Sequence, residues 1–278
     1  MGLDPDPATA GAAFPDVPGE TPAERAGEAV ARWCGRVLEE VATACVAAKL
    51  QLACFERLGA PGWIALHRAV GAARAGGLLV IADGKRGDVP VSAAAYAQAL
   101  FGSTPTPWGD VEGLDADAAT VNGILGADSL EPLIDTAATS GAGLFVLVRT
   151  SNPGAADLLD QATDGGPLHE RIAELVASRG ERLRGSGGLS GLGAVVGATE
   201  PEHIERLRSL MPEAIFLLPG VGAQGGSAAQ LGPAFASGRA AAIVTASRSI
   251  AGANDPAAAA EDLRAQVWDI ACRGSGTG

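Results

Sequence analysis

Aromatic and basic residues are scarce in this sequence. Phe, Trp and Tyr make up 4% of its 278 residues, so a core must be built mainly from small and aliphatic side chains, and hydrophobic residues as a whole reach 47%. Lys and Arg number 20 against 32 Asp and Glu, which gives a formal net charge of −12. Nucleic acids and anionic membranes attract basic proteins, so this balance argues against both as partners. It leaves a phosphorylated small molecule open, because salt limits the reach of distant charges to about 8 Å.

Cysteine and histidine are also few. No Cys-x-x-Cys pair occurs, which favours reduced core thiols over disulfides or a zinc site; the four cysteines are Cys34, Cys45, Cys54 and Cys272. The three histidines each stand alone in a helix-like segment, so no metal site is expected. No apolar run approaches the roughly 18 residues of a membrane span, and the N-terminus lacks a signal-peptide pattern. We therefore expect a soluble, cytoplasmic protein.

What the sequence does contain is a regular alternation of two kinds of segment. Short apolar runs predict strands at 46–51, 78–83, 117–122, 143–149, 193–198, 214–219 and 240–247. Longer amphipathic stretches predict helices at 23–44, 62–75, 91–101, 129–140, 168–179, 201–211, 228–236 and 256–271. Residues 6–22 and 102–114 show neither pattern, and the tail from about 273 to 278 is typical of a flexible segment.

This alternation predicts parallel strands joined by helical crossovers. A (β/α)8 TIM barrel commonly uses about 250 residues as one domain, so we expect a single barrel domain over residues 1–278. Seven of the predicted strands are complete, and Gly2-Leu3-Asp4-Pro5 has the pattern of the end of an eighth. The expected fold is therefore an α/β barrel with a truncated first strand.

Charge is concentrated directly after the second complete strand. Asp83, Lys85, Arg86 and Asp88 follow a run that would otherwise be fully buried, and in a barrel the carboxyl ends of the strands carry the active site. On an extended chain Asp83 and Lys85 point to the same side. Nearby carboxylates would keep Lys85 protonated and able to deliver a proton. The alternative is a solvated turn of ordinary composition.

A second charge, Lys49, interrupts the apolar strand at 46–51. A buried lysine needs a partner, and Asp83 on the adjacent strand is the natural one. A purely structural ion pair would explain Lys49 as well.

Near the C-terminus, Gly220, Gly222 and Gly225 satisfy the G-x-G-x-x-G pattern of a dinucleotide-binding turn. That pattern also expects an acidic residue at the end of the next strand, where this sequence instead has Arg248. A glycine-rich turn followed by an arginine suits the phosphate site that barrels build after strands seven and eight. A turn without a ligand remains the alternative.

The segment Thr150-Ser-Asn-Pro-Gly154 ends another strand with polar side chains. Ser151 or Asn152 could hydrogen-bond a planar ring, although Asn-Pro-Gly by itself indicates only a turn.

Together these segments resemble the bacterial, longer-chain (type 2) branch of the orotidine 5'-monophosphate decarboxylases. The matching stretches run in order from Gly2 to about Ile250: Gly-Leu-Asp-Pro at 2–5, Lys-Leu-Gln-Leu-Ala-Cys-Phe-Glu-Arg at 49–57, Asp-Gly-Lys-Arg-Gly-Asp at 83–88, Ala-Ala-Thr-Val-Asn at 118–122, Gly-Ala-Asp-Ser-Leu-Glu-Pro at 126–132, Thr-Ser-Asn-Pro-Gly at 150–154, Val-Val-Gly-Ala-Thr at 195–199, Pro-Gly-Val-Gly-Ala-Gln-Gly-Gly at 219–226 and Ser-Arg-Ser at 247–249. Where the family commonly has Asp-Ala-Lys and Lys-Pro-Gln, this chain has Asp-Gly-Lys and Lys-Leu-Gln. Neither departure removes a functional side chain.

The resemblance implies a reaction and a role for each residue. Orotidine 5'-monophosphate would lose carbon dioxide to give UMP without a cofactor or metal, and Lys85 would protonate C6. Lys49, Asp83 and Asp88 would complete a charged network, with Asp88 contributed by the opposite subunit of a homodimer. The substrate-binding residues would be Asp4 on the ribose hydroxyls, Ser151 on the pyrimidine edge, and Gln224, Gly225, Gly226 and Arg248 on the 5'-phosphate.

Two further alternatives stay open at the level of sequence. Sugar-phosphate decarboxylases and aldolases of the same superfamily share the pattern D-x-K-x-x-D but resemble magnesium-dependent enzymes. A barrel whose short first strand leaves Asp4 poorly held could bind the nucleotide without turning it over.

Overall fold

The computed structural model describes residues 1–221 and 226–274, and the chain divides into two compact units. The first unit is Met1–Gly84 with Ser247–Arg264, and the second is Lys85–Ala246 with Ala265–Gly278. Strand β3 (Leu79–Arg86) and helix α11 (Pro256–Gly274) each run from one unit into the other. The expectation of a single domain stays a prediction.

The first unit holds the start of the sheet. Its further elements are β1 (Gly2–Leu3), α1 (Pro7–Ala13), α2 (Pro22–Val41), β2 (Ala47–Gln51), α3 (Leu52–Glu56), α4 (Ala60–Ala75) and α10 (Arg248–Ala251). Strand β1 pairs in parallel with β2, which pairs in parallel with β3. The predicted short first strand is confirmed, and it is anchored: the Lys49 amide donates to the Met1 carbonyl at 2.8 Å, and Leu3 is fully buried.

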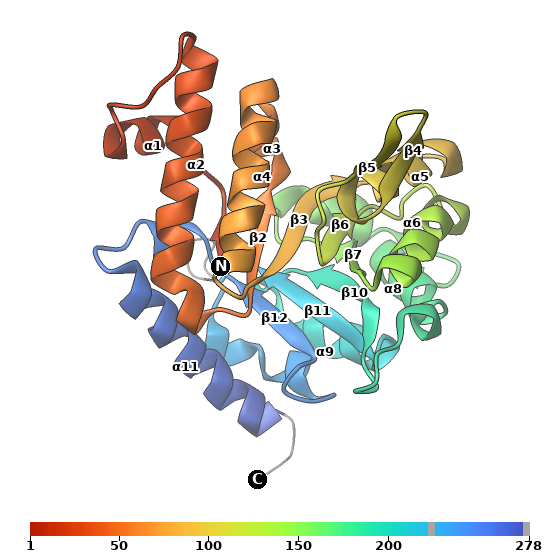
Figure 1. The fold of residues 1–278 in the computed structure, drawn as a ribbon. Helices are drawn as coiled ribbons and strands as arrows, with labels where there is room; N and C mark the ends of the chain where they lie inside the picture. The colour runs from red at the N-terminus through yellow and green to blue at the C-terminus, as the bar shows by residue number, and fades with distance from the viewer. Residues whose placement is uncertain (222–225, 275–278) are drawn as a thin grey trace. The chain divides into compact units, whose positions relative to one another are not determined.

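Helices α2 and α4 lie side by side in this unit (Figure 1). Helix α2 begins with a capping box, in which Thr21 Oγ1 accepts from the Glu24 amide at 3.2 Å and the Glu24 carboxylate accepts from the Thr21 amide at 2.9 Å. A Cβ at Gly27 would lie 2.8 Å from the Pro61 carbonyl oxygen, so glycine there permits the close approach of the two helices.

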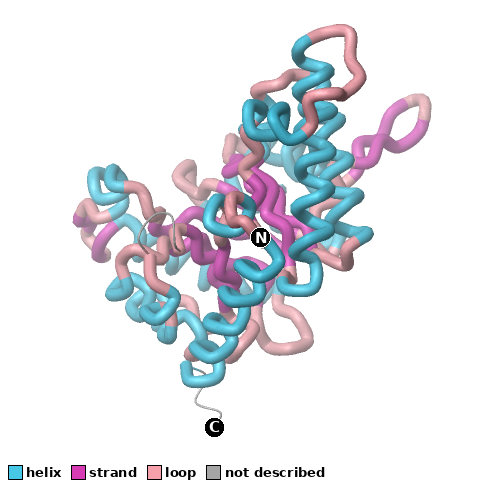
Figure 2. The backbone as a smooth tube through the Cα atoms, turned by 90° about the vertical axis from the view of Figure 1, so that its left-hand side faces the viewer, coloured by secondary structure: helices cyan, strands magenta, loops and turns pink. Residues whose placement is uncertain are grey.

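The second unit continues the alternation of strands and helices, which Figure 2 draws in magenta and cyan for the chain as a whole. Its further elements are α5 (Pro90–Phe101), β4 (Ser103–Thr106), β5 (Gly109–Glu112), β6 (Ala118–Val121), α6 (Ala127–Ser140), β7 (Gly143–Arg149), α7 (Ala156–Leu159), β8 (Ala162–Thr163), β9 (Gly166–Pro167), α8 (Leu168–Ala177), β10 (Ser190–Val196), α9 (Pro201–Leu210), β11 (Ala214–Pro219) and β12 (Ala242–Thr245). Strands β6, β7, β10, β11 and β12 pair in parallel in that order.

Among the described residues, eight strands form one sheet in the order β1-β2-β3-β6-β7-β10-β11-β12, with helices alternating between them. Sequential order and parallel pairing are the construction of a (β/α)8 barrel, so the predicted fold class is confirmed.

Three local predictions were wrong. The helix expected at 228–236 is two short 3-10 turns, Ala228–Gln230 and Gly232–Phe235, because Gly232-Pro233 interrupts the helical pattern. Residues 6–22 contain α1, whose first turn is capped by the Asp6 carboxylate accepting from the Thr9 amide at 3.1 Å. Residues 102–114 contain the antiparallel hairpin β4–β5, whose turn is Pro107–Trp108 and whose second strand begins at Gly109 with φ 114°.

Arg208 is a buried cation at the amino ends of β11 and β12. Its guanidinium donates to the carbonyls of Ala214 at 2.7 Å, Ala234 at 2.8 Å and Ala241 at 2.9 Å, and its central carbon lies 3.7 Å from the centre of the Phe216 ring. Burial lowers the pKa of Arg208 to about 10. Carbonyl dipoles therefore replace the water that this charge loses on folding.

Two glycines of α4 give a test of this packing. A Cβ at Gly62 would lie 1.9 Å from the Phe55 carbonyl oxygen, whereas a Cβ at Gly71 would meet nothing within 4 Å. We expect Gly62→Ala to lower the free energy of unfolding by about 1–3 kcal/mol through overpacking. Gly71→Ala, the matched control, should raise it by up to about 1 kcal/mol through helix propensity. Urea denaturation measures both, and equal effects would contradict the packing account.

Candidate active site

The buried pair Lys49–Asp83 joins the neighbouring strands β2 and β3. Lys49 is 7% exposed and Asp83 4%, and the lysine Nζ donates to the Asp83 carboxylate in a short contact. In the parallel register, Asp83 on β3 lies opposite Gln51 on β2, and Lys49 is two residues earlier on β2. Each charge compensates the burial of the other. The partner predicted for Lys49 is confirmed.

Lys85 follows on the same strand with an unusual backbone. Its φ is 50°, in the left-handed region that non-glycine residues seldom adopt. Its amide donates to Thr120 Oγ1 on β6 at 3.0 Å, and Thr120 is almost fully buried. The side-chain alternation of an extended strand therefore does not decide which way Lys85 points. Such strain, worth about 1–3 kcal/mol, is concentrated at functional sites.

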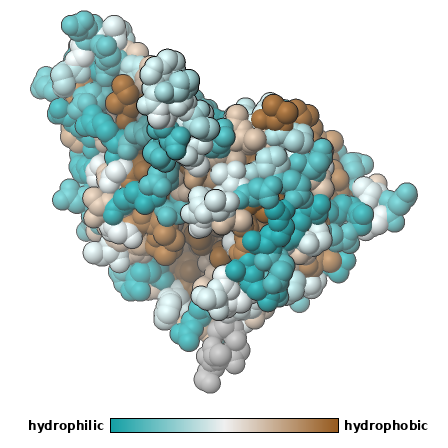
Figure 3. Space-filling view, turned by 45° about the vertical axis from the view of Figure 1, so that its right-hand side comes forward, coloured by the Kyte–Doolittle hydropathy of each residue, from teal (hydrophilic) through white to brown (hydrophobic). Residues whose placement is uncertain are grey.

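Asp88 lies just beyond β3, at the start of α5. Its Oδ1 accepts from the Val89 amide at 2.8 Å, and a Cβ on the preceding Gly87 would lie 2.5 Å from the Asn122 carbonyl oxygen. Four large apolar residues close by in sequence to Asp88 or Asn122 are exposed: Val89, Val91, Ile124 and Leu125. In Figure 3, apolar side chains (brown) reach the surface in small groups between polar ones.

Asp4 and Arg248 line one cavity within the first unit. Its volume is about 240 Å³, and its walls are Gly2, Asp4, Asp6, Thr9, Trp33, Ser247, Arg248, Ala251 and Gly252. Asp4 follows the anchored strand β1, and Arg248 begins the short helix α10. The structure thus brings a predicted ribose ligand and a predicted phosphate ligand together. Strand β1, although short, is paired with β2 directly before Asp4.

Ser151 and Gly226 pack against the segment that follows β10. A Cβ at Gly197 would lie 2.9 Å from the Cα of Ser151, so only glycine permits this contact. Gly226 donates its amide to the Gly220 carbonyl at 3.1 Å, and a Cβ on it would lie 3.2 Å from that of Ala198. Gln224 and Gly225, predicted for the phosphate, lie outside the described residues.

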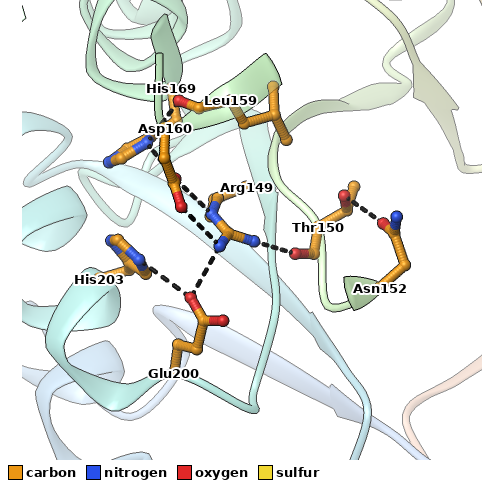
Figure 4. A network of polar contacts seen from close by, with 8 residues as sticks. All are labelled: Arg149, Thr150, Asn152, Leu159, Asp160, His169, Glu200 and His203. Carbon is orange, nitrogen blue, oxygen red and sulfur yellow. Dashed lines mark hydrogen bonds and ion pairs between the residues drawn. The ribbon is translucent and has the colours of Figure 1, made fainter. Parts of the chain in front are cut away.

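Sequence reasoning missed a polar network around Arg149, the last residue of β7 (Figure 4). The Arg149 guanidinium donates to both carboxylate oxygens of Asp160, at 2.8 and 3.0 Å, and to Glu200 at 2.8 Å. His169 and His203, which stand alone in the sequence, contact Asp160 at 3.2 Å and Glu200 at 3.0 Å. The one sequence signal for this network was Arg149 itself, a charged residue at the end of an apolar strand. Lys49 is a comparable charge within an apolar strand.

Two other kinds of site are absent from the described part of the chain. No group of three or more His, Cys, Asp or Glu residues there could hold a metal ion. No helix there combines the length and the apolar character that crossing a membrane requires. Burial raises the pKa of the Cys34 thiol to about 12.

Polar and charged side chains thus follow the carboxyl ends of several parallel strands: Asp4 after β1, Asp83 and Lys85 on β3, Ser151 after β7 and Arg248 after β12. This distribution defines a (β/α)8 barrel enzyme, because barrels carry their chemistry at that face.

Comparison with known proteins gives the family. The model of the orotidine 5'-phosphate decarboxylase / HUMPS family matches residues 27–263. The orotidine 5'-phosphate decarboxylase of Rhodopirellula baltica is 40% identical over 90% of this chain and 82% of its own length. That of Deinococcus radiodurans is 45% identical over 77% of this chain and 74% of its own. The solved OMP decarboxylase of Leishmania donovani superposes with a TM-score of 0.71 at 32% identity, covering 92% of this chain and 91% of that one. The chain belongs to the orotidine 5'-phosphate decarboxylase / HUMPS family.

The Arg149 network predicts how stability depends on pH. The hydrogen bond from Arg149 lowers the pKa of Asp160, so its stabilising contribution is present above about pH 4, the value of a free aspartate, and is lost as pH falls through the lower folded value. We expect Asp160→Asn to be less stable than the wild-type protein at pH 6, with the difference shrinking as pH approaches 3. Urea denaturation across this range measures it; a difference independent of pH would contradict the assignment.

Proposed function

We propose that this chain catalyses the decarboxylation of orotidine 5'-monophosphate to UMP, the last step of de novo pyrimidine nucleotide synthesis, in the cytoplasm and without a cofactor or metal. The observation that carries the proposal is the buried ion pair between Lys49 and Asp83. Lys85, whose backbone is strained, follows two residues after Asp83 on the same strand. Family membership and the relatives' common activity support it.

The proposed chemistry is assigned to Lys85. Loss of carbon dioxide from C6 of the pyrimidine leaves the bonding electron pair on that carbon, and a fixed ammonium beside it stabilises charge that develops only in the transition state. The Lys85 ammonium then gives its proton to C6, and UMP results. Asp83, fixed by Lys49, lies two residues before Lys85 on the same strand.

Substrate binding is assigned to groups remote from C6. Asp4 would bind the ribose hydroxyls and Arg248, in the same cavity, the 5'-phosphate. Gln224, with backbone N–H groups near Gly225 and Gly226, would complete the phosphate site, and Ser151 would hydrogen-bond the pyrimidine edge. Binding energy from the phosphate can then be used to close the site over the reacting ring.

A homodimer completes the proposal, with Asp88 acting in the site of the opposite subunit. The exposed apolar side chains of Val89 and Val91, directly after Asp88, support a contact between copies here. Burying such residues between subunits removes apolar surface from water.

Lys85→Ala tests the chemistry. We expect it to lower kcat by about a thousandfold or more, because the proton donor is lost, while UMP still binds. The assay is the absorbance decrease on mixing protein with orotidine 5'-monophosphate in chelator-treated buffer. Arg36→Ala, which removes an exposed cation of α2, is the control. Near-normal turnover by Lys85→Ala would refute the assignment, and turnover that requires added magnesium would favour the sugar-phosphate enzymes of the family.

Mixing inactive variants tests the shared site. A dimer of one Lys85→Ala and one Asp88→Ala subunit has one site with both native residues and one with neither. After subunit exchange, the mixture should therefore recover about a quarter of wild-type activity. Mixing Lys85→Ala with Asp83→Ala should recover none, because both residues belong to one subunit's strand. No recovery in the first mixture would show that Asp88 acts within its own subunit.

A further inference from the structure

Arg149 is a buried cation with an unusual number of partners for one side chain. Its side chain is 5% exposed, and besides Asp160 and Glu200 it donates from Nη1 to the Thr150 carbonyl at 2.6 Å. A planar guanidinium can hold several acceptors in fixed directions, which a lysine ammonium cannot reproduce. The side chain therefore fixes three segments at once: the end of β7, the end of α7 and the start of α9.

Two of these contacts enclose the segment that carries Ser151. Arg149 precedes residues 150–159 and Asp160 follows them, so the bidentate ion pair closes this stretch into a loop held at its base (Figure 4). Within the loop, Thr150 Oγ1 donates to Asn152 Oδ1 at 2.7 Å. Few conformations remain to a loop whose two ends are clamped together.

The third contact fixes the loop against its neighbour. Glu200 belongs to the segment after β10, where the Gly197 amide donates to the Arg149 carbonyl at 2.7 Å. Ser151 rests directly on Gly197, with no room for a Cβ between them. The side chain and the backbone of Arg149 thus both act on the surface that supports Ser151.

The histidines complete the outer side of the network. His169 Nδ1 lies 2.8 Å from the Leu159 carbonyl oxygen, and its ring meets that of His203 edge to face with centres 4.9 Å apart. His169 therefore contacts both the last residue of the loop and the Asp160 carboxylate, and His203 contacts Glu200, so the two rings help to hold both carboxylates in place for Arg149.

We propose that Arg149 is a positioning residue for the decarboxylation. Through Asp160 and Glu200, Arg149 holds Ser151 in the place where the Ser151 side chain can hydrogen-bond the pyrimidine edge. This rests on the role proposed for Ser151. Arg149 touches neither substrate nor reacting atoms in this account. Its loss should therefore weaken recognition of the base and leave recognition of the sugar phosphate intact.

The test compares two inhibitors on matched variants. We expect Arg149→Met and Arg149→Lys each to raise the inhibition constant of UMP, and to lower kcat/KM, by about ten- to a hundredfold, the scale of a small misplacement in a site. The inhibition constant of ribose 5-phosphate, which lacks the base, should stay within about twofold of wild type, and it also reports that the variants are folded. Arg206→Met breaks a bidentate pair with Glu170 between α8 and α9 and serves as the control.

Ser151→Ala completes a double-mutant cycle. If Arg149 acts through Ser151, adding Arg149→Met to Ser151→Ala should cost little more in kcat/KM than Ser151→Ala alone. Additive losses of kcat/KM in the double variant, or equal losses of UMP and ribose 5-phosphate binding, would overturn the positioning role of Arg149. The role of Ser151 in binding the base would stand. A Ser151→Ala variant with normal UMP binding would instead overturn the role of Ser151, and the inference with it.

Discussion

A lysine inside an apolar strand constrains how the strands of the first unit pair. Removing the Lys49 charge from water costs several kcal/mol unless a carboxylate is fixed beside it, and Asp83 on β3 meets that need. A slip of β2 by one residue would turn Lys49 to the other face of the sheet and leave both charges buried alone. The register of β2 against β3, and of β1 against β2, is thus tied to the electrostatics of the site.

The functional groups after the strands are held by contacts that tolerate little change. The Lys85 amide is fixed by a buried threonine hydroxyl, Ser151 rests on a glycine, and Arg149 holds the loop around it. An enzyme that stabilises a short-lived charge needs groups whose orientation is set before the reaction begins, because reorientation during the reaction would cost energy. Backbone strain and close packing are the means used here.

Sequence patterns predicted the elements whose signal is local. The strands at 143–149 and 214–219 match β7 and β11, since continuous apolar runs bounded by polar residues mark buried strands. The Lys49–Asp83 pair was predictable because a buried charge requires a partner. The Arg149 network was not, because its carboxylates lie 11 and 51 residues away and each alone has the character of a surface residue. The positive φ of Lys85 could not be predicted from the sequence, because lysine has no preference for that conformation and its hydrogen-bond partner, Thr120, lies on another strand.

The contacts of Arg208 affect the order in which the chain can fold during its synthesis. Its carbonyl acceptors at Ala234 and Ala241 lie 26 and 33 residues later in the chain. Until residues 234–241 have been synthesised, the guanidinium lacks two of its carbonyl acceptors, and part of its charge must stay hydrated. The final packing of α9 against β11 therefore waits for the segment that leads into β12.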